Sequence, residues 1–277
     1  GATGLVDFGT TVDGTILTAN TVATLTGQVT YSVYVRSFCG GSDYSAWNGP
    51  VTFTTECDPE VAPTVNQTFA GFVSNPTSPF APLVCWSEGN GAIGTPSTVV
   101  PGNSSWVATS GFGNAGSNPG VKQNVYGTDP GDWLISHPID LGVTAGLYRV
   151  SYRFMVTNYN SSAVAGTMGS HVTNLMISND GGTTWNAADI LASHTGSGSY
   201  TAATYTVNLT TQTGVVKFAF VNVEGGFSPD VDVHIDDFIV ELIPPCLEPS
   251  VAATTLVTDQ TATINWVEPG TLPGVGY

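Results

Sequence analysis

The sequence predicts an all-β protein built of antiparallel sandwiches. Only 9% of its 277 residues are charged, whereas 41% are hydrophobic and 33 are glycine. Apolar and polar residues alternate with a period of two, and turn residues interrupt this alternation about every eight to twelve positions. No window of comparable length shows a period of 3.6 residues, so we expect almost no helix.

The clearest strand is the segment LYRVSYRFMVTN, residues 147–158. Its apolar side chains fall on one face and its arginines on the other, which is typical of a half-buried antiparallel strand. The same reasoning predicts further strands in this order along the chain: residues 29–37, 50–55, 132–141, 172–180, 200–209, 214–223 and 233–242.

The charge balance excludes several classes of partner. Five basic residues stand against twenty-one acidic ones, for a formal net charge of −16. Such a surface repels phosphate backbones and anionic lipid and attracts divalent cations, so we expect no nucleic acid. The sequence shows no run of eighteen apolar residues and no signal-peptide pattern at its start, so membrane insertion is not expected either.

Two proline clusters, ECDPEVAPT at residues 56–64 and LIPPCLEPS at 242–250, predict domain boundaries. They divide the chain into residues 1–57, 58–245 and 246–277.

The outer segments resemble a fibronectin type III domain of secreted Bacteroidota proteins. Residues 31–55, YSVYVRSFCGGSDYSAWNGPVTFTT, are similar to the end of such a domain, and residues 246–270 are similar to its beginning. Because the two parts occur in inverted order, the resemblance implies one period of a tandem array, with partial fibronectin type III (Ig-like) sandwiches on both sides. The alternative is a fragment of a non-repeating protein with two such domains.

The middle segment resembles the jelly-roll sandwiches of the MAM and cleaved-adhesin type. The similarity rests on FAGFVSNPTSPFAPLVCW, YGTDPGDWLISHPIDL, LYRVSYRF, LMISNDGGTTW, TGVVKFAFV and DVHIDDFIVEL, in this order. It implies a secreted surface adhesin of the kind exported by type IX systems.

Four cysteines lack the ligand spacing of zinc sites, which favours disulfides and an extracellular compartment. In a fibronectin-like sandwich, the last strand would separate Cys39 from Cys57 by ~23 Å, beyond the reach of a disulfide. Cys246 would lie at the same pole as Cys39. The resemblance therefore implies a bond from Cys246 of one unit to Cys39 of the next, and a second bond between Cys57 and Cys85.

The segment VHIDDFIVEL contains two adjacent aspartates. Because neighbouring strand residues point to opposite faces, we expect Asp236 on the face of Phe238 and Asp237 on that of Ile235. One carboxylate should then point into the core, where an unpaired charge is costly.

Calcium would neutralise such a carboxylate with oxygen ligands alone. The resemblance also implies structural calcium beside the aspartate pair of the last strand, with Asp237 and Asp236 as preferred ligands and Asp132 as a weaker candidate. The sequence departs from relatives at Ala70, where an acidic residue is common. The alternative is a carboxylate that caps backbone amides at a strand end.

Two further motifs indicate turns rather than chemistry. SNDGGTTW, residues 178–185, fits the Asp box, in which we expect Asp180 to bond turn amides, Gly182 to supply a positive φ and Trp185 to pack beneath the hairpin. GFGNAG, residues 111–116, matches G-x-G-x-x-G but precedes no helix, so it predicts a flexible loop and no dinucleotide site.

The sequence contains none of the common hydrolase motifs, and its four histidines are scattered, so we expect no enzyme. It predicts an extracellular structural and adhesive repeat that contacts glycans, surface proteins or neighbouring copies of itself. The alternative is a carbohydrate-binding or accessory region of a secreted hydrolase. An exposed aromatic platform would favour sugar binding, and its possible members, each also able to pack locally, are Phe112, Tyr126, Tyr159 and Tyr200.

Overall fold

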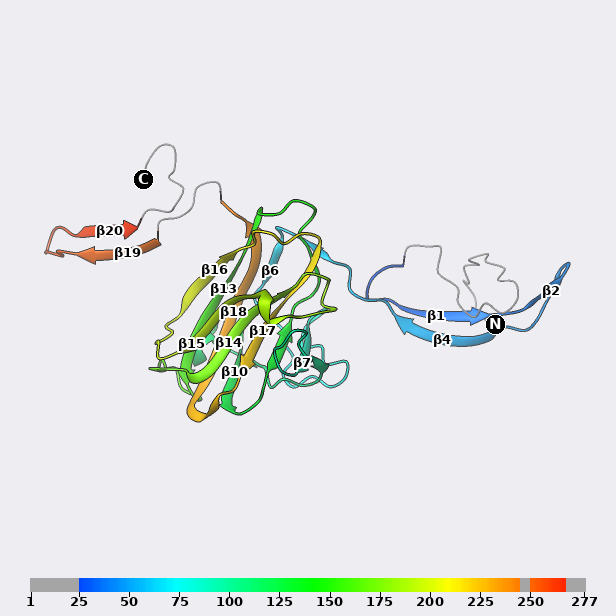
Figure 1. The fold of residues 1–277 in the computed structure, drawn as a ribbon, viewed down its shortest axis with the longest axis horizontal. Coiled ribbons are helices and arrows are strands. Elements are labelled where there is room, and N and C mark those ends of the chain that lie inside the picture. The colour runs from blue at the N-terminus through cyan, green and yellow to red at the C-terminus, as the bar shows by residue number, and fades with distance from the viewer. Residues whose placement is uncertain (1–24, 245–249, 268–277) are drawn as a thin grey trace. The chain divides into compact units, whose positions relative to one another are not determined.

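A computed structural model describes residues 25–244 and 250–267 (Figure 1). The chain divides into two compact units, Gly1–Asp58 and Pro59–Tyr277. Within the described part, the helical elements are two single 3-10 turns, η1 (Phe112–Asn114) and η2 (Ala187–Asp189), so the all-β prediction is confirmed. None of the helices in this part is long and apolar enough to cross a membrane.

The first unit contains two antiparallel pairs of strands. One pair joins β1 (Thr30–Val35) to β4 (Asn48–Thr54), and the other joins β2 (Phe38–Gly40) to β3 (Asp43–Tyr44). Near the other end of the described chain, β19 (Ser250–Thr255) and β20 (Thr263–Val267) form a third antiparallel pair.

The middle of the chain folds into two sheets. The smaller sheet has six strands, in the order β16-β13-β18-β10-β9 with β6 beside β18. Its strands are β6 (Val65–Gln67), β9 (Val107–Thr109), β10 (Gly120–Gly127), β13 (Tyr148–Asn158), β16 (Ala203–Asn208) and β18 (Gly226–Leu242).

The larger sheet has eight strands, in the order β15-β14-β17-β11-β7-β8, with β12 pairing both β17 and β5. Its strands are β5 (Glu60–Val61), β7 (Ser87–Asn90), β8 (Val100–Pro101), β11 (Asp132–Ile135), β12 (Ile139–Asp140), β14 (Gly169–Ser178), β15 (Ile190–Gly196) and β17 (Val215–Val223).

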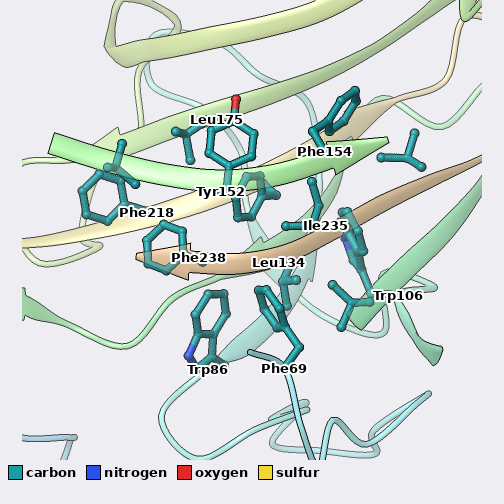
Figure 2. Close-up of a cluster of buried hydrophobic side chains, with 14 of the residues drawn as sticks. Phe69, Trp86, Trp106, Leu134, Tyr152, Phe154, Leu175, Phe218, Ile235 and Phe238 are labelled. Atoms are coloured by element: carbon teal, nitrogen blue, oxygen red, sulfur yellow. The ribbon is translucent and has the colours of Figure 1, made fainter. Parts of the chain in front are cut away.

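The hydrophobic core combines inward-facing side chains of both sheets (Figure 2). On β13 the alternation predicted from sequence holds, because Val150, Tyr152, Phe154 and Val156 are all fully buried. Large rings fill the space between the sheets, and their edge-to-face contacts add to the stability that burial provides. The rings in contact include Phe69, Trp86, Tyr152, Phe218, Phe220 and Phe238.

Each predicted strand segment contains a strand. Residues 132–141 form two short strands, β11 and β12, because Pro138 has no N–H for the ladder and Ser136 takes over bonding to Phe218. Several strands of the two sheets were not predicted, among them β6, β7, β9, β10 and β15. In β10 the inward positions include the polar Gln123, which hides the alternation.

A β-bulge interrupts β18 at Asp237. Between the pairs Ser151–Ile239 and Arg153–Asp236, β13 contributes one residue, Tyr152, whereas β18 contributes two, Asp237 and Phe238. Asp237 has a φ of +46°, a left-handed conformation that aspartate tolerates better than most residues. The extra residue reverses the alternation that follows it.

This bulge corrects the predicted orientation of the aspartate pair. Val233 and Ile235 face the core before the bulge, and Phe238 faces it afterwards. Asp236 therefore lies on the outer face of the sheet and not on the face of Phe238. The side chain of Asp237 is 39% exposed and does not share the buried face of Ile235.

The structure describes three of the four cysteines. Cys57 and Cys85 are both disulfide-bonded, whereas Cys39 is an exposed thiol outside those bonds. Cys246 lies outside the described residues, and its bond to Cys39 of another unit stays a prediction.

The bulge predicts a residue-specific stability effect at Asp237. Asp237→Val should lower the free energy of unfolding by ~1–2 kcal/mol, because a β-branched residue fits the left-handed region poorly. Asp237→Asn keeps the conformational tolerance and removes the charge, so it should change stability much less. Urea unfolding of both variants checks this, and equal losses would show that charge rather than backbone conformation matters.

Candidate functional site

Three ionisable residues of β18 lie on the outer face of the smaller sheet and are nevertheless fully buried. Asp232, His234 and Asp236 each have 0% exposed surface. Residues 110–119, including η1, pack over this face, and η1 contacts both β13 and β18. Such buried polar groups are tolerated only where partners compensate for the lost water.

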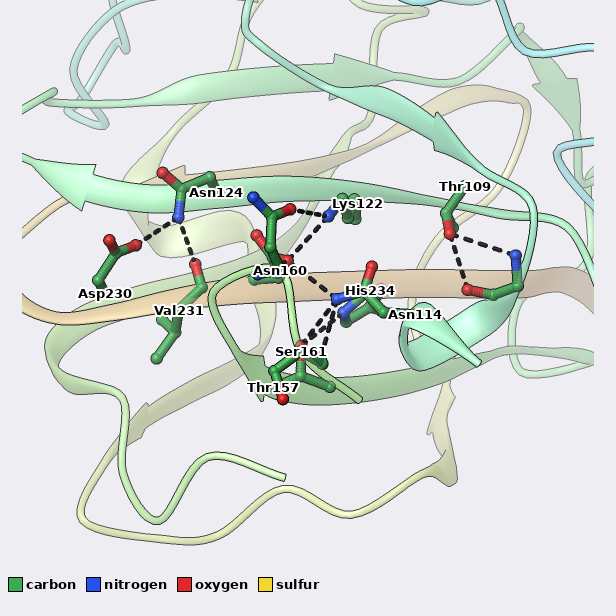
Figure 3. A network of polar contacts seen from close by, with 12 residues as sticks. Thr109, Asn114, Lys122, Asn124, Thr157, Asn160, Ser161, Asp230, Val231 and His234 are labelled. Carbon is green, nitrogen blue, oxygen red and sulfur yellow. Dashed lines mark hydrogen bonds and ion pairs between the residues drawn. The ribbon is translucent and has the colours of Figure 1, made fainter. Parts of the chain in front are cut away.

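Asp232 is the centre of the resulting polar network, and Figure 3 shows its partners Lys122, Asn114 and Asn160. Its Oδ2 accepts bonds from Lys122 Nζ at 2.8 Å, from the backbone N–H of Asn160 at 2.9 Å and from Asn114 Nδ2 at 3.0 Å. Beside it, Thr157 Oγ1 lies 3.0 Å from His234 Nε2. Burial lowers the pKa of His234 to about 4, so this imidazole is neutral at physiological pH.

The loop predicted to be flexible is instead packed. Phe112 is buried, with its ring 6.0 Å from that of His234 and beneath the guanidinium of Arg153 at 4.3 Å. Gly113 has a φ of +70°, and a Cβ there would lie 2.5 Å from Met155 Sδ. The motif therefore positions a cover over the sheet, and its glycine permits close approach to β13.

Asp236 and Asp237 have an arginine as counter-charge. Arg153 Nη1 lies 3.5 Å from Asp236 Oδ2 and 3.7 Å from Asp237 Oδ2. The remaining bonds of Asp236 come from Asn118 Nδ2 at 2.7 Å and from the backbone N–H of Asp237 at 2.8 Å. Burial raises the pKa of Asp236 to about 6. This donor set fits an ion pair with backbone capping better than a cation site.

Asp132, the third predicted calcium ligand, lies on β11 of the other sheet. It is buried among polar side chains, accepts a bond from Gln123 Nε2 at 2.5 Å and pairs in register with Asn222. Burial, followed by the charge of Asp129, raises the pKa of Asp132 to about 7. Among the described residues, no group of three or more His, Cys, Asp or Glu is arranged to hold a metal ion.

An exposed aromatic surface adjoins the buried network, at the end of the sheet where β10 ends and β18 begins. Tyr126 and Phe227 are 46% and 63% exposed, and their rings meet edge to face at 5.2 Å. Tyr159, just after β13, is 49% exposed, and its N–H donates to the carbonyl of Asp230. Asn124 Nδ2 donates to Asp230 Oδ1 at 2.7 Å.

We refer to Tyr126, Tyr159, Phe227, Asn124 and Asp230 as the aromatic surface. Sequence reasoning named its two tyrosines but missed the other three, because their proximity depends on the pairing of β10 with β18. The other two proposed aromatics pack locally: Phe112 in the cover, and Tyr200 against Phe154 and His194.

The outer face of the larger sheet is covered by the Asp box hairpin. Asp180 Oδ1 accepts from the N–H of Thr184 at 2.9 Å, Gly182 has a φ of +95°, and Trp185 packs against Trp133 at 5.5 Å. The expected hairpin lock is confirmed. Beside it lies a cavity of about 280 Å³, whose lining includes Trp185, Ile135, Val99 and Glu88.

Glu88 predicts a pH dependence of stability. Its burial raises the pKa from the ordinary 4.5 to about 7, so the folded state retains a proton that the unfolded state releases. The stabilisation from this proton is complete below about pH 4.5 and is lost as the pH rises to about 7. Glu88→Gln, which is always neutral, should reduce the fall in melting temperature between pH 5 and 8. Parallel profiles for variant and wild type would contradict this.

No protein-family model matches the sequence, and no curated protein is significantly similar to it. Solved structures similar in fold include the K1 cleaved adhesin domain of Lys-gingipain from Porphyromonas gingivalis W83. It is 14% identical, with a TM-score of 0.40 over 65% of this chain and 98% of that one.

The K2 cleaved adhesin domain of Lys-gingipain is 19% identical, with a TM-score of 0.38 over 65% of this chain and 97% of that one. TmCBM61, solved in complex with β-1,4-galactotriose, is 17% identical, with a TM-score of 0.34 over 61% of this chain and 99% of that one. Similarities at this level concern the sandwich fold alone.

Proposed function

We propose that this chain is a non-catalytic extracellular repeat module of a large bacterial cell-surface or filament-forming adhesin. The observation that carries the proposal is the exposed apolar face on the strand pairs near both ends of the described chain. The second candidate is a carbohydrate-binding or accessory region of a secreted hydrolase, and the aromatic surface favours it.

The β1–β4 pair has an apolar face that water contacts. Tyr31 lies opposite Phe53, and Val33 lies opposite Val51. The exposed fractions are 39% for Phe53, 42% for Val33 and 69% for Val51. An isolated two-stranded pair is marginally stable in water. A contiguous apolar patch of this kind usually marks a contact with another protein surface.

The β19–β20 pair has the same property. Ile264 and Trp266, two residues apart on β20, are 58% and 47% exposed. Two sheets can pack their apolar faces together as a β-sandwich. The β19–β20 pair of one copy can therefore cover the β1–β4 pair of another copy. Head-to-tail contacts of this type generate linear assemblies, which suits a repeating surface protein.

The environment of the histidines supports a non-catalytic role. All four are buried, with exposed fractions of 9% for His137, 0% for His171, 5% for His194 and 0% for His234. His194 lies 2.7 Å from the hydroxyl of Tyr152, and burial lowers its pKa to about 4. A general base must reach the proton that it abstracts, and these imidazoles are enclosed by packing.

The proposed cysteine bond gives the test of the repeat. Under oxidising conditions the purified chain should form head-to-tail multimers linked by Cys39 and Cys246, because Cys39 is a free exposed thiol. Cys39→Ser and Cys246→Ser should each abolish the covalent multimers on non-reducing gels and leave the Cys57 and Cys85 bonds intact. Multimers linked through any other cysteine pair would contradict the proposed pairing.

Calcium at Asp236, Asp237 and Asp132 stays a prediction, with Arg153 as the competing counter-charge. If calcium is bound there, chelation with EDTA should lower the melting temperature, and added calcium should restore it. If EDTA has no effect while Arg153→Ala lowers the melting temperature, the ion pair alone compensates for the buried carboxylate. Calorimetry in both conditions separates the two outcomes.

A further inference from the structure

From the aromatic surface we infer that the chain binds a neutral oligosaccharide there. This rests on the extracellular binding role proposed above, in either of its two forms, and names the class of ligand. The pyranose faces of sugars carry apolar C–H groups, and the exposed rings of Tyr126 and Phe227 offer a large, rigid and amphipathic contact for them.

The aromatic rings are held by structure around them. Their edge-to-face contact at 5.2 Å restricts both side chains. The backbone N–H of Tyr126 donates to Glu224 Oε1 at 3.1 Å, which fixes the strand end that carries the ring. A surface ordered before binding loses little conformational entropy when a ligand arrives.

The polar part of the surface has unused hydrogen-bonding capacity. Asn124 Nδ2 donates both to Asp230 Oδ1 at 2.7 Å and to the carbonyl of Val231 at 3.1 Å, which orients the pair (Figure 3). No described residue donates to the remaining oxygens, Asp230 Oδ2 and Asn124 Oδ1, and Asp230 is exposed. Two fixed acceptors beside aromatic rings suit the hydroxyl donors of a sugar.

The charge of the surroundings selects a neutral sugar. Glu224 and Asp230 are acidic, and the two cations of the buried network are already paired, Lys122 with Asp232 at 2.8 Å and Arg153 with Asp236 at 3.5 Å. The net charge of the whole chain is −16. Sulfated, phosphorylated or carboxylated glycans would be repelled by this field.

Tyr159 indicates that more than one sugar unit is contacted. It follows β13, whereas Tyr126 belongs to β10, and β18 lies between these strands. Two strand spacings place the two tyrosine backbones ~10 Å apart. An oligosaccharide that crosses β18 would therefore reach both tyrosines, with Asp230 between them.

Affinity electrophoresis of the full chain tests the inference. Native gels would contain a mixed-linkage β-glucan, a galactomannan, an arabinoxylan or a β-1,4-galactan, with alginate and hyaluronan as anionic comparisons. At least one neutral polymer should retard the chain, and neither anionic polymer should. The double variant Tyr126→Ala/Phe227→Ala should weaken the retardation at least ~10-fold, and Asp230→Ala should weaken it less.

The first unit offers a matched control. Phe38 and Tyr44 form another exposed ring pair, 50% and 46% exposed with centroids 5.1 Å apart, so Phe38→Ala/Tyr44→Ala removes equivalent apolar surface elsewhere. This variant should bind like the wild type. Melting temperatures of all variants establish that they fold.

Retardation by anionic polymers alone, no retardation by any neutral polymer, or equal losses in both double variants would overturn the inference. If glycan binding fails but the Cys39-linked multimers form, the results support a repeat module without a glycan ligand. If the glycan binds but the multimers do not form, the results support the glycan site and favour the accessory region of a hydrolase over the adhesin repeat.

Discussion

The architecture of the sandwich depends on the bulge at Asp237. β18 is the central strand of the smaller sheet and pairs with β10, β13 and β6. A strand with strict alternation would place either Ile235 or Phe238 outside the core, because an odd number of positions separates them. The extra residue allows both to face inward, and the cost is a left-handed backbone conformation at one aspartate.

The same bulge explains why so much polar chemistry is buried on the outside of this sheet. With the core face occupied by apolar residues, Asp232, His234 and Asp236 must face outward, under the cover formed by residues 110–119. Each buried carboxylate then needs a compensating donor, and Lys122, Arg153, Asn114 and Asn118 supply these. These bonds help to fix the position of the cover, since displacing it would remove the donors Asn114 and Asn118 from the two carboxylates.

The sequence predicted the strands far better than the site. Period-2 alternation located the four longest strands, β13, β14, β17 and β18, and the buried face of β13, because one face of each strand has to meet the core. It could not show the bulge, since nothing in the letters of VHIDDFIVEL marks the residue at which alternation reverses. The aromatic surface was equally hidden, because Tyr126 and Phe227 are 101 residues apart in the sequence and meet only through strand pairing. The glycines of GFGNAG suggested mobility, although Gly113 serves close packing against Met155.

Because most basic side chains form ion pairs within the molecule, they do not offset the negative charge of its surface, and this affects how closely two copies can approach each other. Of the five basic residues, three form ion pairs within the sandwich: Lys122 with Asp232, Arg149 with Glu241 and Arg153 with Asp236. The outward field is therefore strongly anionic, and copies held side by side on one surface repel each other. Salt screens such repulsion over ~8 Å at physiological ionic strength, so in a surface layer of these molecules the ionic strength would set the lateral spacing. Cohesion within such a layer has to come from apolar or covalent contacts.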